Sequence, residues 1–345
     1  RWRQKQGAGT TIYYDPRHAW NIDEMSATFD AARRWYSEWF HPYPWRELKL
    51  SEFPGLATYA EGFPTNITFS ENIGFLTKGD EKIDAVFLVT AHETAHQWWG
   101  NLLTPGEGPG GDLLSEGMSH FSMLLLMEKM KGEHARMETA KRLEEKYGDD
   151  RHVDAERPLV RVDGSRDGDT TATYDKGGWV FWMLQRQMGR ERALAGLRQF
   201  INDWSDNPDH PVLQDFIAAM RPFAPDAAAY DDFVRQWFLE VVVPEYRLSD
   251  GRKSRSGSGW EAVVKVRNAG TGRMPVDVAA TRGERFTENG KPAPGWQQAR
   301  STVLLGPGEE REVRIACPFE PDKIVVDPDV QVLQLRRKAA VQSLR

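Results

Sequence analysis

The sequence predicts an α+β protein in which a lobe with a mixed sheet is followed by a helical lobe and then by a small all-β sandwich. Residues 10–77 contain short segments in which apolar and polar residues alternate, as they do in half-buried strands. Between residues 81 and 239 the apolar residues mostly recur with a period near 3.6, which indicates helices. Residues 244–345 return to short alternating segments separated by Gly, Pro and Asn, a rhythm typical of a sandwich.

The first lobe contains an amphipathic helix at residues 21–40. Asn21 suits a helix N-terminus, and the prolines in His41-Pro42-Tyr43-Pro44 end the helix. The elements expected in this lobe are strands at 10–14, 46–53, 56–69 (a strand or a hairpin) and 73–77, and helices at 21–40 and 81–103.

The second lobe is expected to be helical except for a polar, loop-like stretch at 148–173. Its helices are expected at 113–131, 133–147, 174–188, 191–203, 211–220 and 227–239. The strands of the sandwich are expected at 262–267, 274–280, 301–305, 311–315, 323–326 and 330–335. We therefore expect domains at 1–243 and 244–345, the first divided into lobes of about 1–112 and 113–243.

The composition argues against two classes of function. A net charge of −6 and the lack of any dense basic run argue against a nucleic-acid-binding surface. The longest apolar run, at residues 121–127, is far shorter than the roughly 18–20 residues that span a bilayer, and no signal peptide is visible. We expect a soluble domain, either cytoplasmic or a soluble part of a membrane protein. Because the chain starts at Arg1, a larger parent polypeptide fits this expectation.

Residues 92–96 form an H-E-x-x-H pattern inside the helix expected at 81–103. His92 and His96 are four residues apart, so both imidazoles project from one face of a helix and can bind one zinc ion. Glu93 lies next to the first histidine and can reach a metal-bound water as a general base. Two incidental histidines on a helix are the simpler interpretation of the pattern alone.

Three carboxylates downstream could complete a zinc site. Glu107 lies in a Gly/Pro-rich loop that would have to be ordered before it could fix a ligand. Asp112 suits the N-terminus of the next helix, which is a structural role. Glu116 lies one turn into that helix, where a rigid element can present it. We therefore predict Glu116 as the third protein ligand, with the fourth position left for water.

Together, HETAHQWWGNLL and GDLLSEG resemble the gluzincin aminopeptidases, the aminopeptidase N and leukotriene-hydrolase group. The resemblance implies a thermolysin-like catalytic domain, one Zn²⁺ ion, and peptides with a free N-terminus as substrates. Nineteen residues separate His96 from Glu116, one more than is usual in the family, and we expect the extra residue in the glycine-rich loop. The longer spacing is similar to that of peptidase-like domains fused to ABC-type transporter permeases. This resemblance also implies that the chain is fused covalently to a membrane transporter that lies outside this sequence.

A second resemblance lies upstream, in the SENIGFLT stretch at residues 70–77. Its E-N-x-G-F-L-T part matches the family stretch that aligns the peptide and holds its free α-amine, whereas the preceding G-x-M part is absent. The resemblance implies that Glu71 and Asn72 bind substrate. A shifted alignment gives Glu61 as a weaker candidate for the amine. An exposed glutamate at the end of a strand is the simpler interpretation of Glu71.

A third resemblance joins Thr173-Tyr174-Asp175-Lys176-Gly177 to the P-Y-E-K-G stretch of the family. It implies that Tyr174 donates a hydrogen bond to the oxyanion of the tetrahedral intermediate, and a buried aromatic residue is the simpler alternative. Near the proposed ligands, His120 and Ser119 are candidate partners of the metal-binding side chains. An ordinary helical histidine is the simpler interpretation of His120.

Three functions follow from these motifs. A zinc aminopeptidase is favoured, with Glu93 and Tyr174 as its catalytic residues. A zinc endopeptidase is an alternative, because the β-rich domain that precedes the catalytic domain in the family is reduced here to at most the strand at 10–14. The third is a peptidase-like accessory or peptide-binding domain of an ABC-type transporter, with little or no activity.

Overall fold

The first lobe of the computed structural model, which describes residues 2–76 and 84–344, is built on a five-stranded mixed sheet in the order β1-β2-β3-β5-β4. Strands β2, β3 and β5 run parallel, and β1 and β4 are antiparallel edge strands. Apolar residues that alternate along the central strands, including Leu50 and Ile67, form a core with helix α1. The strands are β1 (Arg3–Gln6), β2 (Thr11–Tyr14), β3 (Lys49–Phe53), β4 (Ala60–Phe63) and β5 (Asn66–Ser70).

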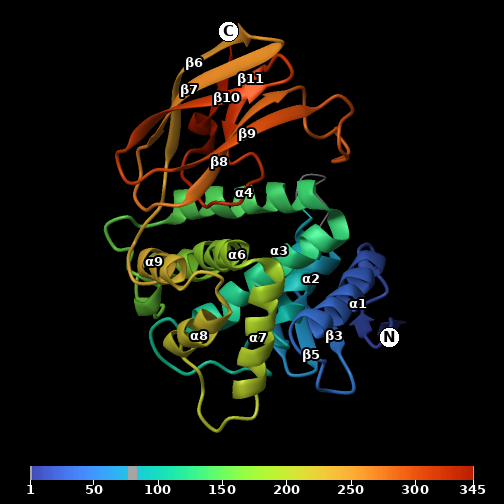
Figure 1. Cartoon of the computed structure of the whole chain (residues 1–345). Helices are drawn as coiled ribbons and strands as arrows, with labels where there is room; N and C mark the ends of the chain where they lie inside the picture. The colour runs from blue at the N-terminus through green and yellow to red at the C-terminus, as the bar shows by residue number, and fades with distance from the viewer. Residues whose placement is uncertain (1, 77–83, 345) are drawn as a thin grey trace.

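Two helices of this lobe, α1 (Ile22–Trp39) and α2 (Ala85–Ala95), lie side by side (Figure 1). The helix expected at 81–103 is shorter, because α2 ends at Ala95 and the chain then turns through Gly100, whose φ is +120°. Residues 81–83 lie outside the described part. The side chains beyond Ala95, such as Trp98 and Trp99, stay buried, which explains why the apolar period continued past the helix.

The strand expected at 73–77 is wrong for residues 73–75, and Thr77 lies outside the described residues. The structure places a π-helical turn, η1 (Glu71–Phe75), directly after β5. The Ser70 hydroxyl accepts a hydrogen bond from the backbone N–H of Asn72 and so caps this turn. The five residues of the expected strand are too few for their period alone to distinguish a strand from a helical turn.

The second lobe is helical, and helix α4 lies between its other helices and the sandwich (Figure 1). Buried aromatic residues, among them Trp179 and Trp237, fill its core. Its elements are η2 (Leu113–Gly117), α3 (Met118–Lys131), α4 (Glu133–Asp150), η3 (Leu159–Arg161), α5 (Asp169–Thr171), η4 (Ala172–Lys176), α6 (Gly177–Met188), α7 (Arg190–Trp204), α8 (Leu213–Met220), η5 (Arg221–Phe223) and α9 (Ala227–Trp237).

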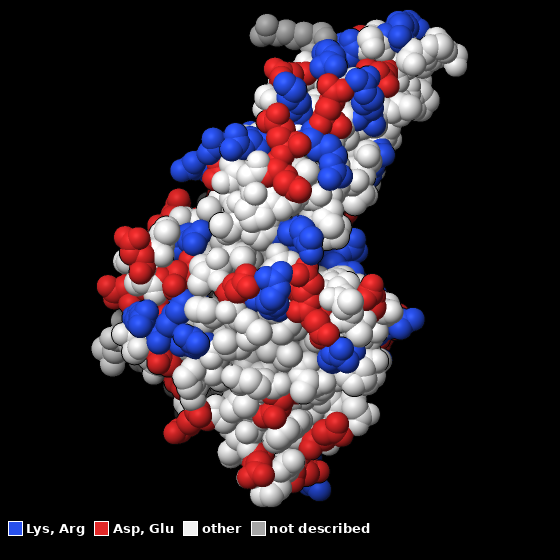
Figure 2. Space-filling view, turned by 60° about the vertical axis from the view of Figure 1, so that its left-hand side comes forward, with Lys and Arg blue, Asp and Glu red and all other residues white. Residues whose placement is uncertain are grey.

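The C-terminal part contains two antiparallel sheets, ordered β10-β7-β6 and β12-β11-β8-β9. On the face shown in Figure 2, basic and acidic side chains are interspersed over this part rather than gathered by sign. The elements are β6 (Tyr246–Ser256), β7 (Gly259–Asn268), β8 (Pro275–Arg282), β9 (Gln297–Leu304), β10 (Glu310–Cys317), β11 (Lys323–Val326), η6 (Arg337–Ala340) and β12 (Val341–Ser343). The α+β class predicted from the sequence is confirmed.

One expected strand of the sandwich is wrong, and two strands are additional. Residues 330–335 form no strand, because Asp327 and Val330 have positive φ angles and the Asp327 carboxylate accepts hydrogen bonds from the backbone N–H groups of Gln331 and Val332. Strand β6 is polar and largely exposed, so its sequence shows no alternation, and its pairing with β7 defines it. The short β12 pairs with β11.

A buried arginine fastens the sandwich to the helical lobe. Arg136 on α4 has no exposed surface, and its guanidinium donates hydrogen bonds to the carbonyl oxygens of Val330 (2.6 Å) and Asp329 (2.9 Å). Farther along α4, Glu144 accepts charge-assisted hydrogen bonds from Arg337 at 2.8 Å. Within residues 2–76 and 84–344, no helix is both long and apolar enough to cross a membrane.

Candidate metal centre

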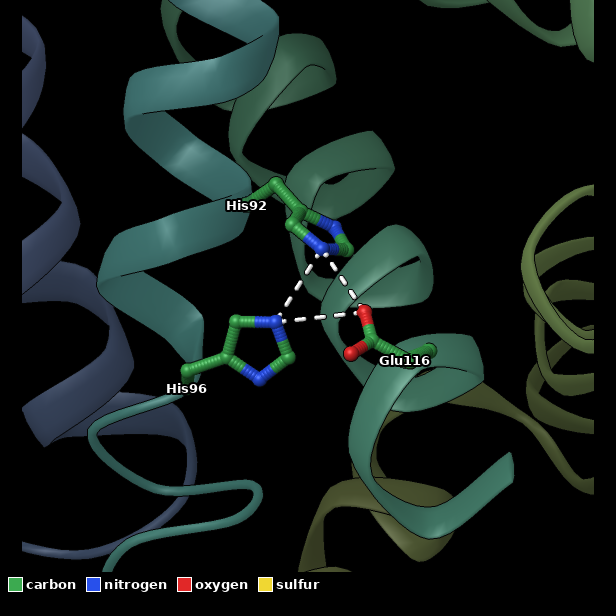
Figure 3. A group of neighbouring side chains, drawn as sticks. All are labelled: His92, His96 and Glu116. Atoms are coloured by element: carbon green, nitrogen blue, oxygen red, sulfur yellow. Dashed lines mark hydrogen bonds and ion pairs between the residues drawn. The ribbon is translucent and has the colours of Figure 1, made fainter. Parts of the chain in front are cut away.

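His92, His96 and Glu116 come together between α2 and the start of the next helix (Figure 3). Nε2 of His92 lies 3.1 Å from Nε2 of His96 and 3.1 Å from Oε2 of Glu116, and the third side of this triangle measures 3.2 Å. Donors that share one tetrahedral zinc ion at 2.0–2.2 Å lie about 3.3 Å or slightly more apart. The triangle therefore fits a zinc ion after shifts of a few tenths of an ångström, and two imidazoles with one carboxylate are donors that zinc accepts.

The second ring nitrogen of His96 is fixed by its surroundings. Its Nδ1 lies 3.0 Å from the carbonyl oxygen of Trp99 and 3.2 Å from the hydroxyl oxygens of Ser115 and Ser119. The Nδ1–H donates to this carbonyl, so Nε2 is the ring nitrogen that faces His92 and Glu116 and is the one that could bind an ion. Ser119 is thus in the position expected of a ligand's partner. No motif in the sequence singled out Ser115.

Glu116 lies on the π-helical turn η2, which leads directly into α3. A π-helical turn holds one residue more than the α-helical turn it replaces. The place of the extra residue in the glycine-rich loop stays a prediction. Burial alone would raise the pKa of the Glu116 carboxyl, but hydrogen bonds from His92 and His96 hold that pKa far below its usual range. The carboxylate stays ionised, as a metal ligand must.

Glu93 projects into the same cavity as the triad. Burial raises the pKa of the Glu93 carboxyl, while the two neighbouring histidines oppose this shift. A raised pKa makes a carboxylate a better proton acceptor, which suits a general base.

Tyr174 also lies on a π-helical turn, η4, which packs against η2. Its ring stacks on the His92 imidazole at a centroid distance of 5.9 Å. Glycines allow the two turns to meet, because a Cβ on Gly177 would lie 3.3 Å from Cα of Gly117. Burial, followed by the nearby Glu116 charge, raises the pKa of the Tyr174 phenol far above its usual value. The phenol therefore keeps its proton and can donate it in a hydrogen bond.

The cavity at the triad has a volume of about 450 Å³, and the edge strand β4 forms one side of it. A Cβ on Gly62 would lie 2.9 Å from the carbonyl oxygen of Glu93 and from Cβ of His96, so only glycine lets this strand run so close to α2. Glu61, the neighbour of Gly62, lines the cavity. The apolar part of the wall, which could not be found from the sequence, includes Leu88, Val89, Met123 and Leu143.

Glu71 and Asn72 do not line this cavity. The Glu71 carboxylate accepts a hydrogen bond from the backbone N–H of Gly55 at 2.8 Å, and the Asn72 amide donates to the Gly55 carbonyl at 3.4 Å. Both side chains thus brace the loop before β4. Of the residues named from the sequence, the structure brings together the triad, Glu93, Tyr174, His120 and the weaker amine candidate, Glu61.

A second group of possible ligands, His18, Glu52 and Glu71, lies where the parallel strands end. Nδ1 of His18 is 2.5 Å from Oε1 of Glu52 and 3.4 Å from Oε2 of Glu71. The shorter distance is that of a direct charge-assisted hydrogen bond, well below the separation of two donors around one ion. We infer that this group is a hydrogen-bonded cluster that joins the ends of β2, β3 and β5.

A mixed-sheet lobe and a helical lobe that share an H-E-x-x-H helix and a glutamate from the next helix define a catalytic domain of the metallopeptidase class. Residues 20–237, well over half of the chain, match the model of the Peptidase family M1 domain. The chain belongs to peptidase family M1, which confirms the family that the motifs resembled.

Three curated relatives are aminopeptidases. The chain is 25% identical to human endoplasmic reticulum aminopeptidase 1 over 240 residues (63% of this chain, 24% of that protein). It is 28% identical to Neurospora crassa leucine aminopeptidase 2 over 174 residues (48% and 25%), and 30% identical to rice aminopeptidase M1-B over 179 residues (48% and 19%). The chain thus matches a quarter or less of each relative's length.

The fold is also similar to a solved structure, Legionella pneumophila aminopeptidase A in complex with aspartic acid. The TM-score is 0.66, and the match covers 97% of this chain and 37% of the other at 18% sequence identity. At this identity the similarity shows a shared fold.

Proposed function

We propose that this chain is a zinc-dependent aminopeptidase that removes N-terminal residues from peptides. One observation carries the proposal: a single cavity contains the three possible zinc ligands together with the Glu93 carboxyl, the Tyr174 phenol and the Glu61 carboxyl. The chain that forms this cavity belongs to a family that includes aminopeptidases. A zinc ion held by His92, His96 and Glu116 would act as a Lewis acid and lower the pKa of a water molecule to about 7.

The side chains around the triad supply the proton transfers and the charge stabilisation. Glu93 accepts a proton from the attacking water and delivers it to the leaving amine. Tyr174 donates a hydrogen bond to the oxygen of the scissile carbonyl as negative charge develops there. Strand β4 lies at the edge of the described sheet, where an extended peptide can pair with its backbone as an added strand. Glu61, on that strand, binds the positively charged α-amine and limits cleavage to the first residue.

Replacing Tyr174 by phenylalanine is expected to lower kcat roughly 100–1,000-fold, the usual cost of losing one oxyanion donor, and to change KM little. The ring and its stacking on His92 are retained, so the loss reports the hydroxyl alone. Steady-state hydrolysis of leucine amide measures both constants. Tyr14→Phe, in the sheet lobe, is the matched control. A Tyr174→Phe protein as active as the control would remove Tyr174 from the mechanism.

The amine site is tested with Glu61→Gln and Glu71→Gln on a free tripeptide and its N-acetylated twin. A hydrogen bond to a charged group contributes about 1.5–3 kcal/mol, so Glu61→Gln should raise KM for the free peptide by roughly 10–100-fold. Glu71→Gln should leave KM unchanged, and wild type should not cleave the acetylated peptide. The reverse pattern between the two variants would assign the amine to Glu71. Equal cleavage of both peptides would favour the endopeptidase alternative.

A further inference from the structure

The metal ligand His92 has an unusual neighbour on its far side. His120 lies on α3, four residues after Glu116, and its Nδ1 is 3.0 Å from Nδ1 of His92. The two rings meet edge to face, with centroids 4.7 Å apart and an interplanar angle of 82°. Because Nε2 of His92 faces the triad, the His92 ring bridges the metal position and the His120 ring.

The chemistry of imidazole decides where the proton between these rings lies. When Nε2 of His92 gives its lone pair to a metal ion, its Nδ1 carries the proton and must donate it. The group in donor range is Nδ1 of His120, which must therefore offer a lone pair and carry its own proton on Nε2. An imidazolium at position 120 would place two N–H groups against each other. The geometry thus defines the tautomer of His120, with its acceptor nitrogen, Nδ1, facing His92.

Packing holds His120 in this position. A Cβ on Gly178 of α6 would lie 2.7 Å from Cβ of His120, so α6 passes as close as its backbone permits. On another side, the Tyr174 ring meets the His120 ring edge to face at a centroid distance of 5.3 Å. His120 therefore has little freedom to turn away from His92.

We propose that His120 is a positioning residue for the metal centre: it accepts the Nδ1 proton of His92 and so directs the Nε2 lone pair at the ion. Metal-bound histidines usually donate this proton to a carboxylate, a carbonyl or water. His96 follows that rule through the Trp99 carbonyl. His92 instead uses an imidazole nitrogen of His120, so this hydrogen bond adds no further carboxylate to the site. The inference rests on the proposed function only in taking zinc as the ion at the triad.

Three substitutions separate positioning from packing. His120→Ala removes the acceptor. His120→Asn keeps an acceptor oxygen near the place of Nδ1, and His120→Gln, of similar polarity, places its amide farther out. The readouts are Zn²⁺ affinity by competition with a chromogenic chelator, the visible spectrum of the Co²⁺-substituted protein, and the thermal unfolding of the metal-free proteins. His152→Ala, at an exposed histidine, is the control.

Zinc affinity is expected to fall roughly 10–100-fold in His120→Ala and His120→Gln, and only a few-fold in His120→Asn. The Co²⁺ bands should shift in the first two variants, while metal-free unfolding temperatures do not follow this order. Wild-type affinity in a folded His120→Ala protein would overturn the inference. If that variant fails to fold, equal affinities of the Asn and Gln variants would overturn it. A wild-type chain that binds no zinc would overturn the proposed function as well.

Discussion

Replacing Glu93 by glutamine is expected to lower kcat for peptide hydrolysis roughly 100–10,000-fold, the range that a general base contributes, while the protein keeps its zinc. Glutamine has the same shape as glutamate, but its amide cannot accept the proton of the attacking water. Glu93 is not part of the ligand triangle, so the affinity of the triad for zinc should change little. Hydrolysis of amino-acid amides and metal analysis of the same samples measure the two effects separately.

Glu107→Gln is the matched control for this experiment, because Glu107 is exposed in the glycine-rich loop and does not line the cavity. The control should keep the wild-type rate. A Glu93→Gln protein that holds zinc and hydrolyses amides at the wild-type rate would show that Glu93 is not the base.

Replacing Glu116 by glutamine is expected to lower the zinc affinity by more than roughly 100-fold. Loss of a side chain that only hydrogen-bonds to a ligand lowers metal affinity roughly 10–100-fold, and loss of a ligand should lower it further. The substitution removes the anionic donor from the triangle and leaves two neutral imidazoles. Competition with a chelator measures the loss, and hydrolysis should disappear at zinc concentrations that saturate wild type.

Asp112→Asn distinguishes the two acidic residues of this segment. Asp112 precedes η2, is exposed, and makes no side-chain capping hydrogen bond. Its variant should bind zinc as wild type does. Loss of zinc in Asp112→Asn together with retention in Glu116→Gln would reverse the choice of third ligand.

The meeting of His92, His96 and Glu116 could be predicted from the sequence because it depends on local structure. His92 and His96 need only one helical turn between them, and Glu116 needs only a rigid element that follows. The end of α2 at Ala95 could not be predicted, since the tryptophans beyond it are buried in a turn as well as they would be in a helix.

For the amine-binding residue the sequence favoured Glu71 over Glu61, whereas the structure places Glu61 in the cavity. The sequence around Glu71 matches the family stretch, but the strand that packs against α2 is β4. The residue of β4 that precedes Gly62 and lines the cavity is Glu61. Which glutamate faces the cavity depends on the β4–β5 hairpin and on the close approach at Gly62, and neither leaves a strong pattern. His120 was ambiguous for a similar reason, because its role depends on contact with a residue 28 positions earlier.

Some expectations stay predictions. The helices end with α9 and the strands of the C-terminal part begin with β6. On that basis we propose the domain boundary after residue 243. Covalent fusion to a membrane transporter, and the compartment in which the chain acts, also stay predictions. An accessory domain without activity remains the rival that the catalytic measurements address.

The central claim is that one zinc ion at the triad makes this chain an aminopeptidase. The most direct measurement is a zinc titration of the metal-stripped protein, followed by the release of leucine from leucine amide. We predict no hydrolysis without metal, and a rate that rises with added zinc until about one ion is bound per chain. Hydrolysis that persists in the stripped protein would contradict the claim, and so would a fully zinc-loaded protein that hydrolyses none of a panel of amino-acid amides.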